Sequence, residues 1–132
     1  MRMEKRKSLE KNLFTIMLAG TLVVTSVTTV FATSGNGNWD IGGFSINGSN
    51  TVVSTYGKGT TGGSAKPYKN YVVVSIYNKK NKRMSIGSST AKNAKASKTL
   101  LGVNPKRVFS CHGVYHKNKL VDGVLKGINT SR

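Results

Sequence analysis

One short run of residues constrains the fold of this chain more than any other. Residues 71–78 read YVVVSIYN, so β-branched and aromatic side chains predominate. The run is too short for an ordinary helix, and polar residues border it on both sides. On a strand, alternate side chains point to opposite faces, and here both faces are largely apolar. The sequence therefore predicts a central strand that is buried on two sides.

The rest of the chain beyond residue 50 also has the pattern of short strands. MSIGSST follows YVVVSIYN across the polar turn NKKNKR, and RVFSCHGVYH is joined to KLVDGVLKGI by KNK, so we expect two hairpins, with VDG as a turn or bulge. The segment TAKNAKASKTLLG is ambiguous, because its composition suits a helix and its alternation suits a strand; we favour a strand. No run shows a sustained 3.6-residue apolar period. The expected fold is all-β, a small antiparallel β-sandwich or barrel built from hairpins.

The N-terminus has the pattern of a secretory signal peptide. Five basic residues precede the apolar run LFTIMLAGTLVVTSVTTVFA, and no charged residue occurs from Leu13 to Ser34. Val30 and Ala32 have the spacing of the small residues before a signal-peptidase site, so we predict cleavage after Ala32 and a secreted, extracellular protein. The alternative is an uncleaved membrane anchor, since about 20 apolar residues can span a bilayer.

The remaining chain divides by composition. Residues 33–63, which begin TSGNGNWDIGGFSINGSN, are rich in Gly, Asn, Ser and Thr, and their short apolar groups separated by Gly pairs and NG indicate short strands and tight turns, with a disordered tail at 33–38. We therefore expect three parts: a signal peptide at 1–32, a partly disordered N-terminal arm at 33–50, and a small antiparallel β domain at 51–132.

Charge is the strongest functional signal. The chain has 21 Lys and Arg against four acidic residues; beyond Ala32 it keeps 16 basic residues against Asp40 and Asp122, a formal net charge of +14. Such a charge attracts anions over a long range. Outside a cell the available anions are phospholipid headgroups, wall polymers and acidic glycans, whereas export disfavours nucleic acid as the partner. The alternative is that the charge only maintains solubility and the partner is a protein.

The candidate partner-binding residues are the cations at the two expected hairpin tips and at the start of the last hairpin. They are Lys79, Lys80, Lys82, Arg83, Lys106, Arg107, Lys117 and Lys119.

Cys111, His112 and His116 are the only Cys and His residues of the chain. On a strand the two His side chains would share one face about 13 Å apart, too far for one metal ion, and Cys111 would point to the other face. A Cys/His nucleophile needs the two groups within hydrogen-bond reach. We therefore expect no metal site, no catalytic residue and no cofactor, and we interpret Cys111 as a buried small hydrophobe.

The organisation of the chain resembles the lactococcin-type bacteriocins. The features behind the resemblance are a basic signal peptide, a small region rich in Gly, Ser, Asn and Lys, WDIGG at 39–43, and paired hairpins. The resemblance implies a small secreted β-sandwich that acts on the envelope of competing bacteria. The chain ends in GINTSR and lacks the aromatic ending of that family.

Together these features predict a secreted cationic protein that binds anionic cell-envelope or surface components and has a bacteriocin-like antimicrobial action. The alternative is a secreted, non-enzymatic structural or protein-interaction module. A Cys/His-dependent enzyme is the least favoured interpretation.

Overall fold

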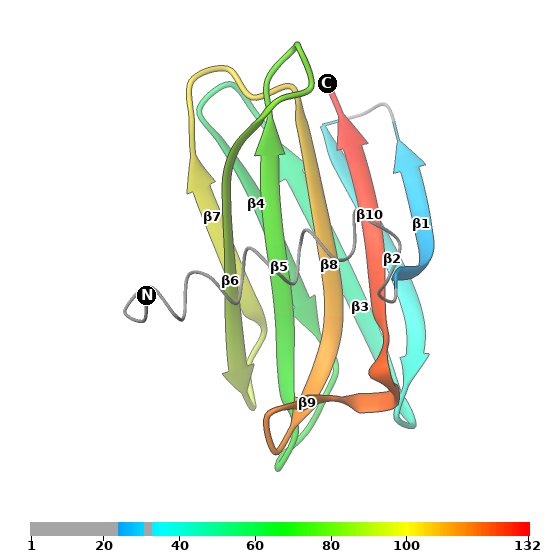
Figure 1. Cartoon of the computed structure of the whole chain (residues 1–132). Coiled ribbons are helices and arrows are strands. Elements are labelled where there is room, and N and C mark those ends of the chain that lie inside the picture. The colour runs from blue at the N-terminus through cyan, green and yellow to red at the C-terminus, as the bar shows by residue number, and fades with distance from the viewer. Residues whose placement is uncertain (1–23, 31–32) are drawn as a thin grey trace.

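Two β-sheets pack face to face in the computed structural model, which describes residues 24–30 and 33–132 (Figure 1). The strands are all antiparallel to their neighbours except β1, which pairs with β10 in parallel. The sheets do not close into a barrel. The all-β fold class is therefore confirmed, in its sandwich form.

The first sheet, called sheet A, has the strand order β1-β10-β8-β5-β6, with the short strand β9 paired to β8. Its strands are β1 (Val24–Val30), β5 (Lys69–Tyr77), β6 (Arg83–Lys92), β8 (Arg107–His116), β9 (Lys119–Leu120) and β10 (Leu125–Ser131). The second, sheet B, has the order β2-β3-β4-β7. Its strands are β2 (Ser34–Ile41), β3 (Phe44–Val52), β4 (Tyr56–Gly62) and β7 (Ala96–Leu101).

The strand predicted at 71–78 is β5, which lies between β6 and β8. Every residue from Asn70 to Tyr77 is buried, as expected for a strand covered on both faces. Val72, Val74 and Ile76 pack between the sheets. Tyr71, Val73 and Tyr77 belong to a second cluster on the outer face of sheet A. The prediction of a central strand is confirmed.

Both expected hairpins are also present. β5 pairs with β6, and β8 pairs with β10 after an interruption by β9 and the short 3-10 turn η1 (Val121–Gly123). Asp122 and Gly123 have φ angles of 59° and 63°, so VDG is a turn, as predicted. The ambiguous segment at 90–102 contains strand β7, which confirms the preference for a strand.

The short strands expected in the Gly- and Asn-rich region are present, but the separate, partly disordered arm predicted at 33–50 is wrong. These residues form β2 and most of β3, so the boundary at residue 50 falls inside a strand, and Asn47 and Gly48 lie in mid-strand and not in a turn. Only Gly42 and Gly43, with φ angles of 61° and 83°, form a tight turn. Glycine within these strands has a different use: Gly48 faces inward, where an added Cβ would lie 2.7 Å from the His112 ring. It permits close approach of the two sheets.

Part of the predicted signal peptide is described and part is not. Residues 24–30, VTSVTTV, form β1, consistent with the strand preference of β-branched residues. Residues 1–23 and 31–32, and with them the predicted cleavage site, lie outside the described residues. A chain cleaved after Ala32 would lack β1, and β10 would then be the edge of sheet A. No described helix is long and apolar enough to cross a membrane.

The space between the sheets contains two apolar clusters with a polar layer. One cluster is built from β5, β8, β3 and β7, with Val52, Ile76 and Leu100 among its members. The other is smaller and contains Ile41 and Val114 near the turn of β2 and β3. A layer of buried polar side chains completes the interior: Asn50, Thr61, Ser110, His112 and Thr130.

Candidate functional site

The predicted cations lie at opposite ends of the sandwich. Lys79, Lys80, Lys82 and Arg83 surround the β5–β6 turn, and Lys106 and Arg107 begin β8 at the same end. Lys117 and Lys119 lie beyond the other end of β8, near β9. The ten residues of β8 place these groups about 30 Å apart, at about 3.3 Å per residue. The eight candidates therefore form two separate groups.

The β5–β6 turn is held in one shape by Asn78. Its side-chain oxygen accepts hydrogen bonds from the backbone N–H groups of Lys80 and Lys82, at 2.9 and 3.0 Å. The backbone N–H of Asn81 donates to the Asn78 carbonyl, and Asn81 takes a φ of 63°. This local bonding fixes the turn while Lys79, Lys80 and Lys82 remain exposed.

Arg107 connects this turn to the neighbouring strands. Its Nε and one terminal nitrogen donate to Asn81 Oδ1, at 3.0 and 2.8 Å, and the other donates to Asn129 Oδ1 at 2.8 Å. The guanidinium also lies 3.8 Å from the ring centre of Tyr77. Arg107 is therefore half-buried and positions the turn, and its charge adds to the field there.

Arg132 completes this group, and the sequence reasoning missed it. Its backbone N–H donates to the carbonyl of Lys106 at 3.0 Å, and its side chain donates to the Pro105 carbonyl and the Asn104 side chain. A basic residue at the end of the final strand was the available signal, but only the pairing of β10 with β8 shows which hairpin it joins.

We call these seven residues, Lys79, Lys80, Lys82, Arg83, Lys106, Arg107 and Arg132, the basic end of the sandwich. They come from the β5–β6 turn, the start of β8 and the C-terminus, which Figure 1 shows side by side at one end of the molecule.

Both carboxylates of the region 33–132 lie at the other end. Asp122, in η1, accepts a hydrogen bond from the backbone N–H of Gly42 at 2.9 Å, and Asp40 is two residues before that glycine. The strand β10 separates Asp122 from Arg132 by about 20 Å. No acidic side chain within the described region therefore neutralises the basic end.

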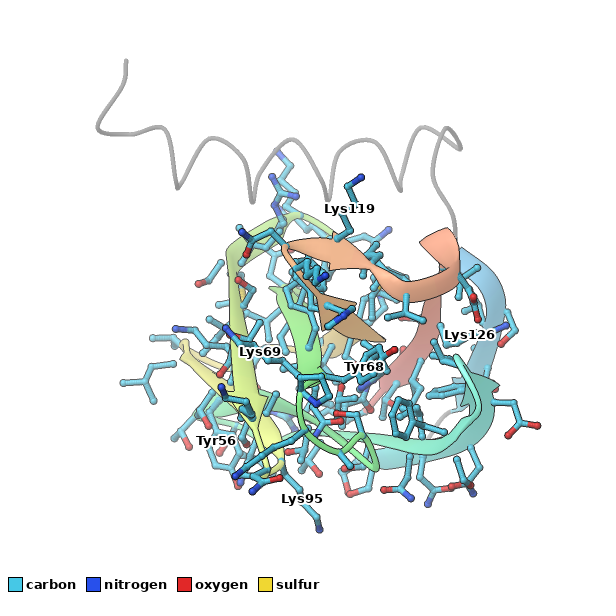
Figure 2. All side chains as sticks on the ribbon, turned by 90° about the horizontal axis from the view of Figure 1, so that it is seen from below. Tyr56, Tyr68, Lys69, Lys95, Lys119 and Lys126 are labelled. Carbon is cyan, nitrogen blue, oxygen red and sulfur yellow. The ribbon has the colours of Figure 1, made fainter. Side chains whose placement is uncertain are left out.

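The end with the carboxylates also carries cations. Lys117 and Lys119 flank the turn of β8 and β9, and Lys69 begins β5 next to them. Figure 2, which views the molecule from this side, shows Lys119 over β9, and Lys95 projecting on the side of sheet B. Asp122 lies at the same end of the sandwich.

His112 belongs to the polar layer between the sheets. The Thr61 hydroxyl lies 2.7 Å from Nδ1 and the Ser110 hydroxyl 2.7 Å from Nε2, so both ring nitrogens have partners. Trp39 stacks on the ring at a centroid distance of 5.7 Å. Burial lowers the pKa of His112 to about 3, and a backbone hydrogen bond with Thr60 opposes this shift. The ring is neutral and joins the two sheets.

Asn50 extends this layer. Its amide nitrogen donates to Ser110 Oγ at 2.9 Å and to the Ile128 carbonyl at 3.0 Å, and its oxygen accepts from Thr130 at 2.5 Å. All of these groups are buried, so the network satisfies polar atoms that would otherwise destabilise the core.

Cys111 and His116 lie apart from this network. Cys111 is on the opposite face of β8, as predicted, and is completely buried in the outer cluster of sheet A, which confirms its interpretation as a small hydrophobe. Burial raises the pKa of its thiol, so the reactive thiolate is disfavoured. His116 packs against the Tyr68 ring at a centroid distance of 4.3 Å. In the described part of the chain no three His, Cys, Asp or Glu residues converge as metal ligands would.

Comparison with known protein families, with curated proteins and with solved structures finds no match to this chain. The candidate site therefore depends on its own geometry. Several exposed ammonium groups on a fixed turn, with no acidic side chain nearby, can pair with phosphate or carboxylate groups that repeat along a polymer.

Proposed function

We propose that this protein is secreted and binds an anionic polymer or lipid surface of the bacterial cell envelope through its basic end. The observation that carries the proposal is the separation of charge. Seven cations gather at one end of the sandwich, and both carboxylates of residues 33–132 lie at the other. This arrangement orients the protein as it approaches an anionic surface.

The site favours a partner with repeated charges. Lysine ammonium groups on a turn make point contacts with any phosphate or carboxylate. Contacts of this kind add up along a polymer or over a membrane surface. The action is therefore binding without catalysis, and growth inhibition of bacteria would be its consequence, as the resemblance to secreted bacteriocins implies.

The test compares two variants of equal charge. Lys79→Glu with Lys80→Glu reverses two charges at the basic end, and Lys117→Glu with Lys119→Glu reverses two at the other end. Both lower the net charge by four, so any difference between them reports the location of the site. Binding is measured to Gram-positive cell walls and to anionic and neutral vesicles at several salt concentrations, with growth inhibition in parallel.

We expect the first variant to lose at least about tenfold in affinity, or about 1.4 kcal/mol, and the second to lose much less. Binding by the unaltered protein should weaken with salt, because screening acts beyond about 8 Å at physiological ionic strength. Equal losses by both variants would mean that total charge matters and that no site exists. Binding that salt leaves unchanged would contradict the proposal altogether.

A further inference from the structure

The outer face of sheet B is rich in hydroxyl and carboxamide side chains. The strand register places the following residues on it: Ser34, Asn36, Asn38, Ser45, Asn47, Ser49, Thr51, Thr60, Ser97 and Thr99. Most of them are exposed. The same register also places Asp40, Tyr56, Lys58 and Leu101 on this face, so the neutral hydrogen-bonding groups are its largest set and not its whole surface.

Two rows of these side chains enclose a trough. Asn36, Ser49 and Thr60 are paired across β2, β3 and β4 and form the first row. The second row is Asn38, Asn47 and Gly62, two residues further along each strand, or about 6.6 Å away. A hollow of about 350 Å³ lies between and beside these rows, with Lys95 at its β7 side.

The floor of the trough is backbone. Gly37 and Gly48 lie between the rows and face inward, so their peptide groups line the hollow. Below them are aromatic rings: an added Cβ would lie 2.5 Å from Trp39 at Gly37 and 2.7 Å from His112 at Gly48. The floor therefore rests on the buried layer that joins the sheets, which keeps it in place.

The second row is open at Gly62. Gly62 has no side chain at this outward position, so the row stops after Asn47. The stem of Lys95 lies across the gap, and a Cβ added to Gly62 would be 3.1 Å from Lys95 Cγ. A residue with a longer side chain would continue the row and fill the trough. At Gly62 the flexible Lys95 stem thus takes the place of a fixed side chain in the second row.

The polar groups of the trough are available for a ligand. Ser34 bonds to Thr51, and Thr60 to Ser97, at 3.1 Å in both pairs. Among the residues that the structure describes, the side chains of Asn36, Asn38, Asn47 and Ser49 make no hydrogen bond. Each carboxamide offers two donors and an acceptor, a combination that matches hydroxyl groups, which also donate and accept.

We propose that this trough binds a glycan, laid across β2, β3 and β4 between the two rows. The lining has no carboxylate and one cation, Lys95, so the recognised part of the ligand is an uncharged sugar with many hydroxyl groups. The two strand spacings from β2 to β4, about 10 Å, give room for a short oligosaccharide. This site shares no residue with the basic end, and its function does not depend on the proposal for that end.

The first experiment is calorimetric titration of the full chain with two probes, β-linked tetrasaccharides of glucose and of N-acetylglucosamine. Trp39 is the only tryptophan and lies directly below the floor, so its fluorescence gives a second measure of occupancy. We expect binding of at least one probe, with little dependence on salt. Failure to bind either tetrasaccharide would overturn the proposal.

Variants then locate the site. Asn38→Ala with Asn47→Ala removes two carboxamides and should weaken binding by about tenfold, because each carboxamide loses its hydrogen bonds to the sugar. Gly62→Thr should block the trough while the fold persists, because the nearest atom to an added Cβ belongs to a flexible lysine. Ser45→Ala with Thr99→Ala is the matched control on the same face and should change nothing. Equal affinity in all three variants would contradict the assignment.

The two proposals can fail separately. Lys79→Glu with Lys80→Glu, which tests the basic end, should leave tetrasaccharide binding unchanged. If that variant loses sugar binding to the same extent as the Asn38 and Asn47 variant, the trough is not the glycan site.

Discussion

The two outer faces of the sandwich have opposite chemistry. On sheet A the outward side chains of Tyr71, Val73, Tyr77, Cys111 and Leu125 are buried and form an apolar cluster of their own. On sheet B the outward side chains are mainly Ser, Thr and Asn, with Asp40, Tyr56, Lys58 and Leu101 beside them, and most are exposed. A sandwich needs apolar side chains only between its sheets, so packing between the sheets does not determine which side chains occur on the two outer faces.

The difference shows which part of the molecule contributes to stability and which is available for binding. Burial of apolar area stabilises by about 25 cal/mol per Å², so the outer cluster of sheet A acts as a second core. The Tyr71 and Tyr115 rings stack in it at 4.6 Å. The outer face of sheet B buries little, and its residues can change with little effect on folding.

The largest effect should come from truncation of the sheet A cluster. Leu125 is completely buried there, and an added Cβ at Gly113 would lie 2.8 Å from its Cδ2. Leu125→Ala should lower the free energy of unfolding by about 2–5 kcal/mol, because it removes buried methyl groups and leaves a cavity. Asn38→Ala on sheet B should change it by less than about 0.5 kcal/mol. Urea denaturation of both variants measures this; equal costs would remove the distinction between the faces.

Acid should lower the free energy of unfolding through His112, which is buried between the sheets. The folded pKa of His112, about 3, is below its unfolded value of 6.5, so the neutral ring favours folding. This contribution is complete above about pH 6.5 and is lost as the pH falls toward 3. At pH 5 the loss should be about 2 kcal/mol, from about 1.4 kcal/mol per pH unit. In His112→Gln this part of the pH dependence should disappear from urea denaturation series; an unchanged slope would mean that other groups cause it.

Two glycines of sheet B allow its inner and outer faces to be compared: Gly48 faces inward and Gly62 faces outward. Gly48→Ala would bring a Cβ to 2.7 Å from the His112 ring and should cost about 1–3 kcal/mol through overpacking. Gly62→Ala points outward toward the flexible Lys95 stem and should be almost neutral or slightly stabilising. Thermal denaturation of the two variants provides the comparison. A larger cost at Gly62 would show that the trough is part of the stable core.

The smallest effect should come from the hydroxyl pairs of the outer face. Ser34 and Thr51 lie opposite each other and bond at 3.1 Å at an exposed position. A double-mutant cycle with Ser34→Ala and Thr51→Ala should give a coupling energy of about 0.2–1 kcal/mol. A coupling above this range would mean that the polar face also stabilises the fold.

The sequence predicted the elements whose side-chain pattern is local. YVVVSIYN is apolar on both faces and became the central strand β5, and the polar turns at 78–82 and 117–118 joined the strands that flank them. The arm at 33–50 was mispredicted because Gly and Asn also occur within strands where a partner sheet approaches closely, as at Gly48. That approach depends on the His112 ring, more than 60 residues away in sequence.

The residues of the two candidate sites also divide into those that the sequence could predict and those that it could not. Cations at Lys79, Lys80 and Lys82 could be found because turns between strands are exposed wherever the strands lie. Arg132 could not be assigned to them, since its position depends on the pairing of β10 with β8. The trough could not be found either, because its two rows exist only in the register of β2, β3 and β4.

The sequence by itself determined the strand class of the fold, the excess of positive charge and the exposure of charged turns, since each follows from side chains close together along the chain. The tertiary structure alone decided that the predicted cations form two groups about 30 Å apart, that both carboxylates lie away from the basic end, and that Asn38 and Asn47 share a wall of one trough. These properties depend on strand order and register, which are set by contacts between distant segments.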